Sequence, residues 1–193
     1  MKAAVVVAHP DDEIIWCGGY VLTHPEWDWT VMALARAGDP DRAPRFKNVC
    51  AHIGAESHIS DLDDGEPLAP IDPAADIGGR VLAALAAERW DLVLTHGPNG
   101  EYGHPRHVET HEAVETLVRS GKLTAGELLT FAYECDPSTG ECVPAPWADI
   151  SMDLAPDIIT EKRRIVRDLY GFGPGSFEAR AAGSPECFRR LRR

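Results

Sequence analysis

Histidine and acidic residues gather in two short segments of the 193-residue chain. Residues 8–13 read AHPDDE, and residues 96–107 read HGPNGEYGHPRH. Imidazole and carboxylate groups are ligands that suit zinc, and a catalytic zinc keeps three protein ligands and one open position. In the second segment His104 and His107 lie three positions apart, so at the start of a helix they project from one side. Both segments are therefore candidate parts of a metal centre.

The elements that must position these segments can be predicted from the apolar pattern. Four apolar runs predict buried strands, at residues 3–8, 30–35, 91–95 and 128–133. Apolar residues at helical spacing predict helices over about residues 77–86, from Pro105 to Ser120, and over about residues 158–170. Buried strands separated by helices indicate an α/β fold, a mainly parallel sheet with helices on both faces.

The order of these elements places both polar segments at the same edge of the sheet. Residues 8–13 follow the first predicted strand, and residues 96–107 follow the strand at 91–95. In such a fold the chemistry lies at the carboxyl ends of the strands, so the two segments can converge on one ion. The alternative is that the acidic residues only cap the following helix and that the histidines are partly buried without a metal.

Charge and hydropathy exclude several classes of partner. The chain carries 19 Lys and Arg against 31 Asp and Glu, a net charge of −12, which disfavours nucleic acid. No stretch approaches the ~20 apolar residues of a membrane span. The first apolar run is broken at His9, so we expect no signal peptide. Arginines 189, 190, 192 and 193 are interpreted as a solvated tail end.

Cysteine usage and length complete the compositional picture. The five cysteines form no CxxC motif and are odd in number, which favours a reduced, cytoplasmic compartment. Cys135 and Cys142 remain one candidate pair. A length of 193 residues predicts little more than one domain.

The two polar segments, with a strand before and a helix after the first, resemble the PIG-L/LmbE-like family of zinc-dependent N-acetylglucosaminyl deacetylases. The resemblance extends to the acidic stretch at residues 61–65 and to residues 148–151, which lead into a basic helix ending in tyrosine. It implies a Rossmann-like α/β fold and a single deacetylase domain over residues 1–193. The active site would lie at the C-terminal ends of the strands.

The resemblance also implies a role for each polar residue. It assigns three zinc ligands, His9, Asp12 and His107. Asp11 would be the general base for a zinc-activated water, and His104 would face the substrate carbonyl. His104 or Tyr102 would stabilise the oxyanion, and either Asp11 or His104 would protonate the leaving amine.

The implied reaction is removal of an N-acetyl group from an amino sugar, a GlcNAc-containing small molecule. The alternative is a zinc amidohydrolase acting on a non-sugar N-acyl substrate. A nucleotide-binding module without catalysis is disfavoured, because it needs a glycine-rich turn where this chain has AHPDDE. Many family members show Arg and then Glu three positions later, where this chain has Arg42 and Arg45. The sequence leaves the exact sugar and a homo-oligomeric state open.

Other polar residues receive weaker assignments. His111 is expected in the core or behind the ligands, and His96 either supports a ligand or simply packs. Arg36 either meets the substrate or forms an ordinary salt bridge, and residues 61–65 are expected to form a turn. The tryptophans are assigned to packing, at positions 16, 27, 29, 90 and 147.

Overall fold

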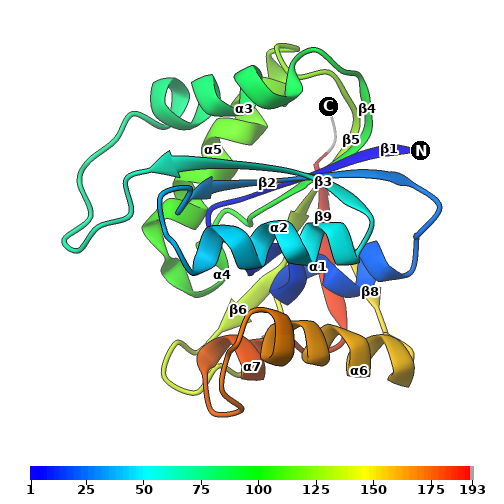
Figure 1. Ribbon diagram of the computed structural model, residues 1–193. Coiled ribbons are helices and arrows are strands. Elements are labelled where there is room, and N and C mark those ends of the chain that lie inside the picture. The colour runs from blue at the N-terminus through cyan, green and yellow to red at the C-terminus, as the bar shows by residue number, and fades with distance from the viewer. Residues whose placement is uncertain (192–193) are drawn as a thin grey trace.

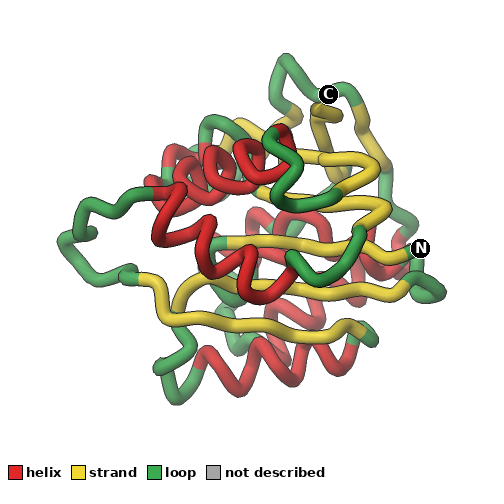
Figure 2. Tube along the Cα trace, turned by 90° about the horizontal axis from the view of Figure 1, so that it is seen from above, coloured by secondary structure: helices red, strands yellow, loops and turns green. Residues whose placement is uncertain are grey.

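The computed structural model describes residues 1–191, which fold around a central seven-stranded sheet (Figures 1 and 2). The strand order is β3-β2-β1-β4-β5-β9-β8. The strands from β3 to β5 in that order pair in parallel, whereas β9 is antiparallel to both neighbours. The strand bounds are β1 Lys2–Val7, β2 Asp28–Ala35, β3 Ala55–Leu62, β4 Trp90–Thr95, β5 Ala125–Phe131, β8 Ile150–Met152 and β9 Glu186–Leu191.

Helices cover both faces of this sheet, as Figure 1 shows. One face carries α1 (Asp12–Leu22), α2 (Arg42–His52), α6 (Pro156–Arg164) with the π-helical turn η2 (Ile165–Leu169), and α7 (Phe177–Ala181). The other face carries α5 (Pro105–Arg119) and α3 (Gly78–Leu85), which follows the π-helical turn η1 (Pro73–Ile77). Successive residues of β1 enter the two cores alternately, because side chains along a strand point to opposite faces.

The expected α/β architecture is confirmed, with three strands of the seven-stranded sheet that the apolar pattern did not reveal. The predicted strands at residues 3–8, 30–35 and 91–95 correspond to β1, β2 and β4. The run at 128–133 is divided, because β5 ends at Phe131 and β6 (Tyr133–Cys135) begins at Tyr133. β3, β8 and β9 were missed. β3 is an edge strand whose residues are mostly only half buried, so it lacks an apolar run.

The C-terminal arginines differ from the sequence-based expectation. Arg189 and Arg190 are exposed, but they belong to β9 within the sheet rather than to a solvated tail. Arg190 forms an ion pair with Glu127 of the neighbouring strand β5. This pairing helps a basic segment to join the sheet, because the neighbouring strand supplies an acidic partner two residues from Leu129, which lies opposite Arg190. Arginines 192 and 193 lie outside the described residues.

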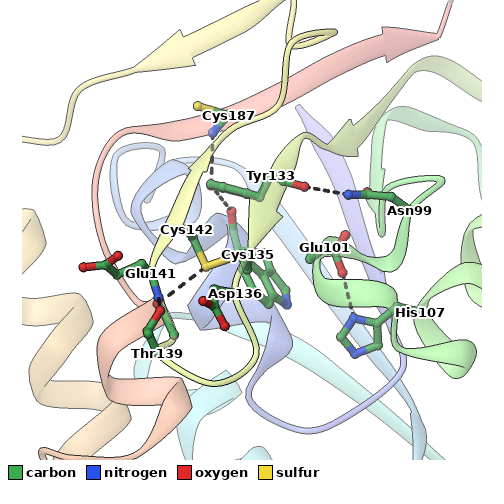
Figure 3. Close-up of a disulfide and its surroundings, with 12 residues drawn as sticks. Asn99, Glu101, His107, Tyr133, Cys135, Asp136, Thr139, Glu141, Cys142 and Cys187 are labelled. Carbon is green, nitrogen blue, oxygen red and sulfur yellow. Dashed lines mark hydrogen bonds and ion pairs between the residues drawn. A yellow bond between two sulfur atoms is a disulfide. The ribbon is translucent and has the colours of Figure 1, made fainter.

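The candidate cysteine pair is joined in the structure. Cys135 and Cys142 form a disulfide across the antiparallel hairpin of β6 and β7 (Cys142–Pro144), which is drawn in Figure 3. The tip of this hairpin lies against α7, because a side chain at Gly140 would meet Arg180 and the Phe177 carbonyl. Within the described part of the chain, no helix combines the length and apolar character needed to cross a membrane.

A buried ion pair ties the C-terminal strand to α1. The α1 helix is interrupted at Cys17, whose φ of −143° is not helical. Just beyond the break, the amides of Gly19 and Tyr20 donate to the Glu186 carboxylate at 2.7 and 2.6 Å. Lys162 Nζ donates to the same carboxylate at 2.7 Å, and both charged side chains are at most 1% exposed. Removing either charge would therefore leave the other buried without a counter-charge, since water cannot replace the lost partner.

We expect Lys162→Met to lower the free energy of unfolding by about 3–5 kcal/mol, because it leaves Glu186 buried without its counter-charge. The matched control is Lys2→Met, since the pair of Lys2 with Glu88 is about half exposed and such pairs contribute little. Urea unfolding of both variants measures the difference. Equal losses in the two variants would show that the buried pair stabilises no more than a surface pair.

Candidate active site

Neighbouring parallel strands bring polar loops to one edge of the sheet. β3, β2, β1 and β4 lie side by side, and their carboxyl ends are followed by Asp64, Arg36, His9 and His96 respectively. The chain leaves β1 toward β2 on one side, while β4 lies on the other, so the strand order reverses beside β1. Ligands in open α/β sheets bind at such a reversal. The topology therefore concentrates the candidate residues where a substrate can reach them.

The atoms of the three predicted metal ligands lie close together. His9 Nδ1 is 3.2 Å from Asp12 Oδ2 and 3.2 Å from His107 Nε2. His107 Nε2 is 3.4 Å from Asp12 Oδ2. An ion held tetrahedrally at ~2.0–2.1 Å separates its ligand atoms by about 3.3–3.4 Å. The spacing of these three atoms fits that geometry.

Each of the three predicted ligands is also hydrogen-bonded to a further side chain. His9 Nε2 contacts Asp64 Oδ1 at 3.1 Å, and His107 Nδ1 contacts Glu101 Oε2 at 2.7 Å (Figure 3). Pairing the far ring nitrogen of a ligating histidine with a carboxylate fixes its tautomer and ring orientation. Asp12 uses one oxygen to accept from Trp16 Nε1 at 2.9 Å, which leaves Oδ2 facing the two imidazoles. All three ligand atoms therefore point inward.

Two further histidines lie beside these atoms and differ in what they can do. His96 accepts from the Ala8 amide at its Nε2, 3.0 Å away, and faces Glu101 with its Nδ1 at 2.8 Å. Both of its nitrogens are occupied, so His96 supports the cluster from behind. His104 lies 4.8 Å from the rings of both His9 and His107, and its Nδ1 is buried without a hydrogen-bond partner among the described residues. His104 therefore differs from His96 in having a ring nitrogen that no described protein group occupies.

The loop that carries the second histidine segment is strained. Glu101 adopts a φ of +60°, in the left-handed region that residues with a Cβ rarely occupy, and lies between Gly97 and Gly103. This turn directs its carboxylate inward, where Oε1 accepts from the Gly97 amide at 2.7 Å and Oε2 meets both His96 and His107. A side chain at Gly97 would approach the Phe131 carbonyl to 2.3 Å, so the position requires glycine.

The adjacent carboxyl groups of the first segment have opposite electrostatic environments. Burial raises the pKa of Asp11 well above its ordinary value, and the neighbouring Asp12 carboxylate raises it further. Burial acts in the same direction on Asp12, but His107 and His96 outweigh it and hold the pKa of Asp12 well below its ordinary value. Asp12 therefore stays ionised, while Asp11 is suited to accept and hold a proton.

A polar cavity of about 260 Å³ opens onto these groups. Its wall includes His9, Asp11, Asp12, Arg36, Arg42, Asp64, Tyr102, His104, and from α7 Phe177 and Glu178. Burial and the charges of His107 and His9 lower the pKa of His104 to about 4, so its ring is neutral at pH 7. The volume is below the roughly 300–1,000 Å³ of drug-sized pockets, so it admits only a small part of a substrate.

Comparison with known proteins identifies the family to which this fold and site belong. A family model described as PIG-L: GlcNAc-PI de-N-acetylase matches residues 4–118, more than half of the 193-residue chain. The chain belongs to the PIG-L family. The match contains both polar segments and ends before β5, so it does not include α7 or Tyr170.

The relatives of this PIG-L family member include named deacetylases. The chain is 27% identical over 154 residues to the 1D-myo-inositol 2-acetamido-2-deoxy-alpha-D-glucopyranoside deacetylase of Corynebacterium diphtheriae, covering 62% of this chain and 53% of that protein. The chain spans about half the length of several curated relatives that it matches.

Solved structures share the PIG-L fold at low sequence identity. The N,N'-diacetylchitobiose deacetylase from Pyrococcus horikoshii aligns with a TM-score of 0.72 at 14% identity, covering 98% of this chain and 83% of that chain. GalB, the 4-carboxy-2-hydroxymuconate hydratase from Pseudomonas putida KT2440, aligns with a TM-score of 0.66 at 18% identity, covering 94% and 83% respectively. At these identities the similarity shows the fold alone.

The structure assigns contacts to residues of this PIG-L family member that sequence reasoning missed or left open. Glu101, Asp64 and Trp16 each hydrogen-bond a predicted metal ligand, although Asp64 was expected in a turn and Trp16 in packing. Arg36 pairs with Asp64 through two nitrogens, at 2.9 and 2.6 Å, and also lines the cavity. His111 contacts the His96 carbonyl at 2.9 Å, behind the cluster as expected.

We expect Glu101→Gln to weaken zinc binding by about 10- to 100-fold, because one carboxylate oxygen meets both imidazoles and the other accepts from the Gly97 amide, whereas an amide group offers only one oxygen. The matched control is Glu112→Gln, the same change at an exposed position of α5, which should bind zinc as the parent does. Competition with a chromogenic chelator on metal-stripped protein measures both affinities. Unchanged affinity in Glu101→Gln would remove this carboxylate from any role at the ligands.

Proposed function

We propose that this chain is a zinc-dependent N-deacetylase that removes the acetyl group from an amino sugar, a GlcNAc-containing small molecule. The observation that supports this proposal most strongly is the ligand geometry. The ligand atoms of His9, Asp12 and His107 lie within 3.4 Å of one another, and Asp11 and His104 line the same cavity. Membership of the PIG-L family and the names of its relatives point the same way.

The donor set favours zinc among the common biological ions. Two imidazole nitrogens and one carboxylate oxygen suit zinc, whereas calcium and magnesium prefer oxygen ligands. His9, Asp12 and His107 would hold the ion, with Asp64 and Glu101 orienting the two imidazoles. A zinc ion bound there would polarise the amide carbonyl and lower the pKa of a water molecule toward ~7.

Asp11 is positioned to move the proton in this reaction. Its raised pKa lets its carboxylate take a proton from the attacking water as the new C–O bond forms. When the amide C–N bond breaks, the leaving nitrogen needs one proton, and the protonated Asp11 carboxyl can return it. The products are acetate and the free amine. Arg42 Nη1 lies 3.5 Å from Asp11 Oδ2, and this ion pair helps to keep the carboxyl group in the cavity.

His104 is suited to stabilise the negative charge that develops on the carbonyl oxygen. Its neutral ring can donate one hydrogen bond, and its buried Nδ1 has no partner within the described part of the chain. A donor aimed at the position where charge develops is worth far more in a buried site than in water. Tyr102, whose ring lies 5.8 Å from that of His104, lines the same wall and is the second candidate donor.

The substrate class rests on the relatives and on the cavity wall. The Corynebacterium diphtheriae relative is named for an acetamido-glucopyranoside, and the Pyrococcus horikoshii protein for diacetylchitobiose. The rings of Tyr102 and Phe177, 4.8 Å apart, line a cavity whose wall is mostly polar, as a sugar requires. Acetate release from N-acetylated sugars and N-acetylated amino acids, with and without zinc, tests the class. Turnover of the amino acids alone would favour the non-sugar amidohydrolase.

We expect the same substitution at Asp11 and at Asp12 to have different effects on zinc binding and turnover. Asp11→Asn should retain zinc, because no ligand is lost, and its turnover should fall by ~10² to 10⁴, the size of a general-base contribution. Asp12→Asn should bind zinc more weakly, because an amide oxygen is a poorer ligand, and added zinc should partly restore its activity. Zinc content and acetate release at two zinc concentrations measure both effects.

The control for this pair is Asp157→Asn, the same change at an exposed position of α6, which should leave zinc and turnover unaltered. The outcome that reverses the assignment is loss of zinc from Asp11→Asn together with rescue by added zinc. In that case Asp11 is the ligand and Asp12 the base.

We expect His104→Ala to keep its zinc and to lose turnover by ~10² to 10³, because the donor for the developing oxyanion is removed. His58→Ala on β3, away from the cavity, is the control for histidine removal. Steady-state kinetics and metal analysis of both variants distinguish the effects. Undiminished turnover in His104→Ala would transfer this role to Tyr102.

A further inference from the structure

The backbone of Asp11 is held in an unusual conformation. Its φ is +119° with ψ at −31°, in a region that residues with a Cβ rarely occupy. Such a conformation persists only where surrounding groups fix it, and it occurs often at functional sites. The Asp11 carbonyl accepts from the amides of Ile14 and Ile15 at 2.9 and 3.0 Å, so the first turn of α1 fixes one side of the residue. The Asp11 amide, on the other side of the residue, needs a hydrogen-bond acceptor of its own.

Glu13 supplies that partner. Its Oε2 accepts from the Asp11 amide at 3.0 Å, and its side chain is fully buried in the first turn of α1. The bond spans two residues and closes a small ring around the strained position. Rotation of the Asp11 backbone away from its φ of +119° would break this bond and leave a buried carboxylate oxygen without its donor.

Tyr170 fixes the orientation of Glu13 in turn. The Tyr170 hydroxyl donates to Glu13 Oε1, the oxygen that does not meet Asp11. Tyr170 is only 2% exposed and follows η2, so it reaches Glu13 from a segment 157 residues later in the sequence. Neither Glu13 nor Tyr170 belongs to the wall of the cavity. They form a chain of contacts behind Asp11, away from the substrate.

We propose that Glu13 and Tyr170 are positioning residues for Asp11, which fix its left-handed backbone so that its carboxylate faces the cavity. This inference rests on the proposed function, in which Asp11 is the general base. It assigns Glu13, which follows the two aspartates, a role distinct from metal binding. It also gives the C-terminal part of the chain, beyond the residues matched by the family model, a part in the reaction.

The test begins with Tyr170→Phe, which removes one hydroxyl and keeps the buried ring. We expect kcat to fall by about 10- to 100-fold, the effect of misplacing a reacting group by a fraction of an ångström to one ångström. KM and zinc content should stay the same, because the ligands and the cavity wall are untouched. Glu13→Gln should show the same pattern. If Glu13→Gln does not fold, Tyr170→Phe alone carries the test.

A control separates this effect from a general loss of stability. Val81→Ala removes buried methyl groups from α3, on the opposite face of the sheet, and lowers stability without approaching Asp11. We expect its kcat to match the parent at a temperature where all variants are folded. A fall in kcat for Val81→Ala equal to that of Tyr170→Phe would overturn the proposal, because loss of stability would then explain both.

The deciding measurement is a double-mutant cycle with Asp11→Asn. If Tyr170 acts through Asp11, Tyr170→Phe lowers kcat in the parent and causes no further fall in the Asp11→Asn background. A fall by the same factor in both backgrounds, or no fall in either, overturns this inference while leaving Asp11 as the base. Full turnover of Asp11→Asn itself would instead overturn the proposed function, and this inference with it.

Discussion

The structure depends on one constraint: each carboxylate that is buried must find hydrogen-bond donors in place of water. Among the described residues the buried acids are Asp12, Glu13, Glu101 and Glu186. A carboxylate withdrawn from water is costly unless donors replace its hydration. Each of these groups accepts from a backbone amide. Each also meets a polar side chain: Asp12 and Glu101 meet His107, Glu13 meets Tyr170, and Glu186 meets Lys162. The need to satisfy them joins the strand-end loops to α1, α5 and α6.

The same contacts determine the arrangement of the candidate site. Glu101 contacts the imidazole of His107, and Asp64 contacts that of His9, so the predicted ligand atoms are aligned by electrostatics as well as by packing. Arg36 in turn binds Asp64 through two nitrogens, which connects the carboxyl ends of β2 and β3 to the cluster. Charge compensation therefore extends across neighbouring strands, and preorganisation of this kind costs no rearrangement when a ligand arrives.

The sequence predicts the part of this arrangement that depends on periodicity and strand order. The apolar run at residues 3–8 identifies β1 because both of its faces are buried, and parallel strand ends bring His9 near His107. β3 escapes detection because an edge strand has polar residues along an open face. Glu101 escapes because its role depends on a φ of +60°, which residue spacing does not encode. Asp64 reaches His9 only through a long-range loop contact.

The position of Tyr170 late in the chain has a consequence for biosynthesis. Strands β1 to β4 and every predicted metal ligand lie before residue 108, so they leave the ribosome well ahead of η2, α7 and β9. A domain generally folds as a unit once its chain has been synthesised. During synthesis the residues of the histidine and aspartate cluster are all present before Tyr170, which contacts Glu13, and before α7, which lines the cavity. The cavity can take its final form only after Tyr170 and α7 have been synthesised, and both come later in the chain than every predicted metal ligand.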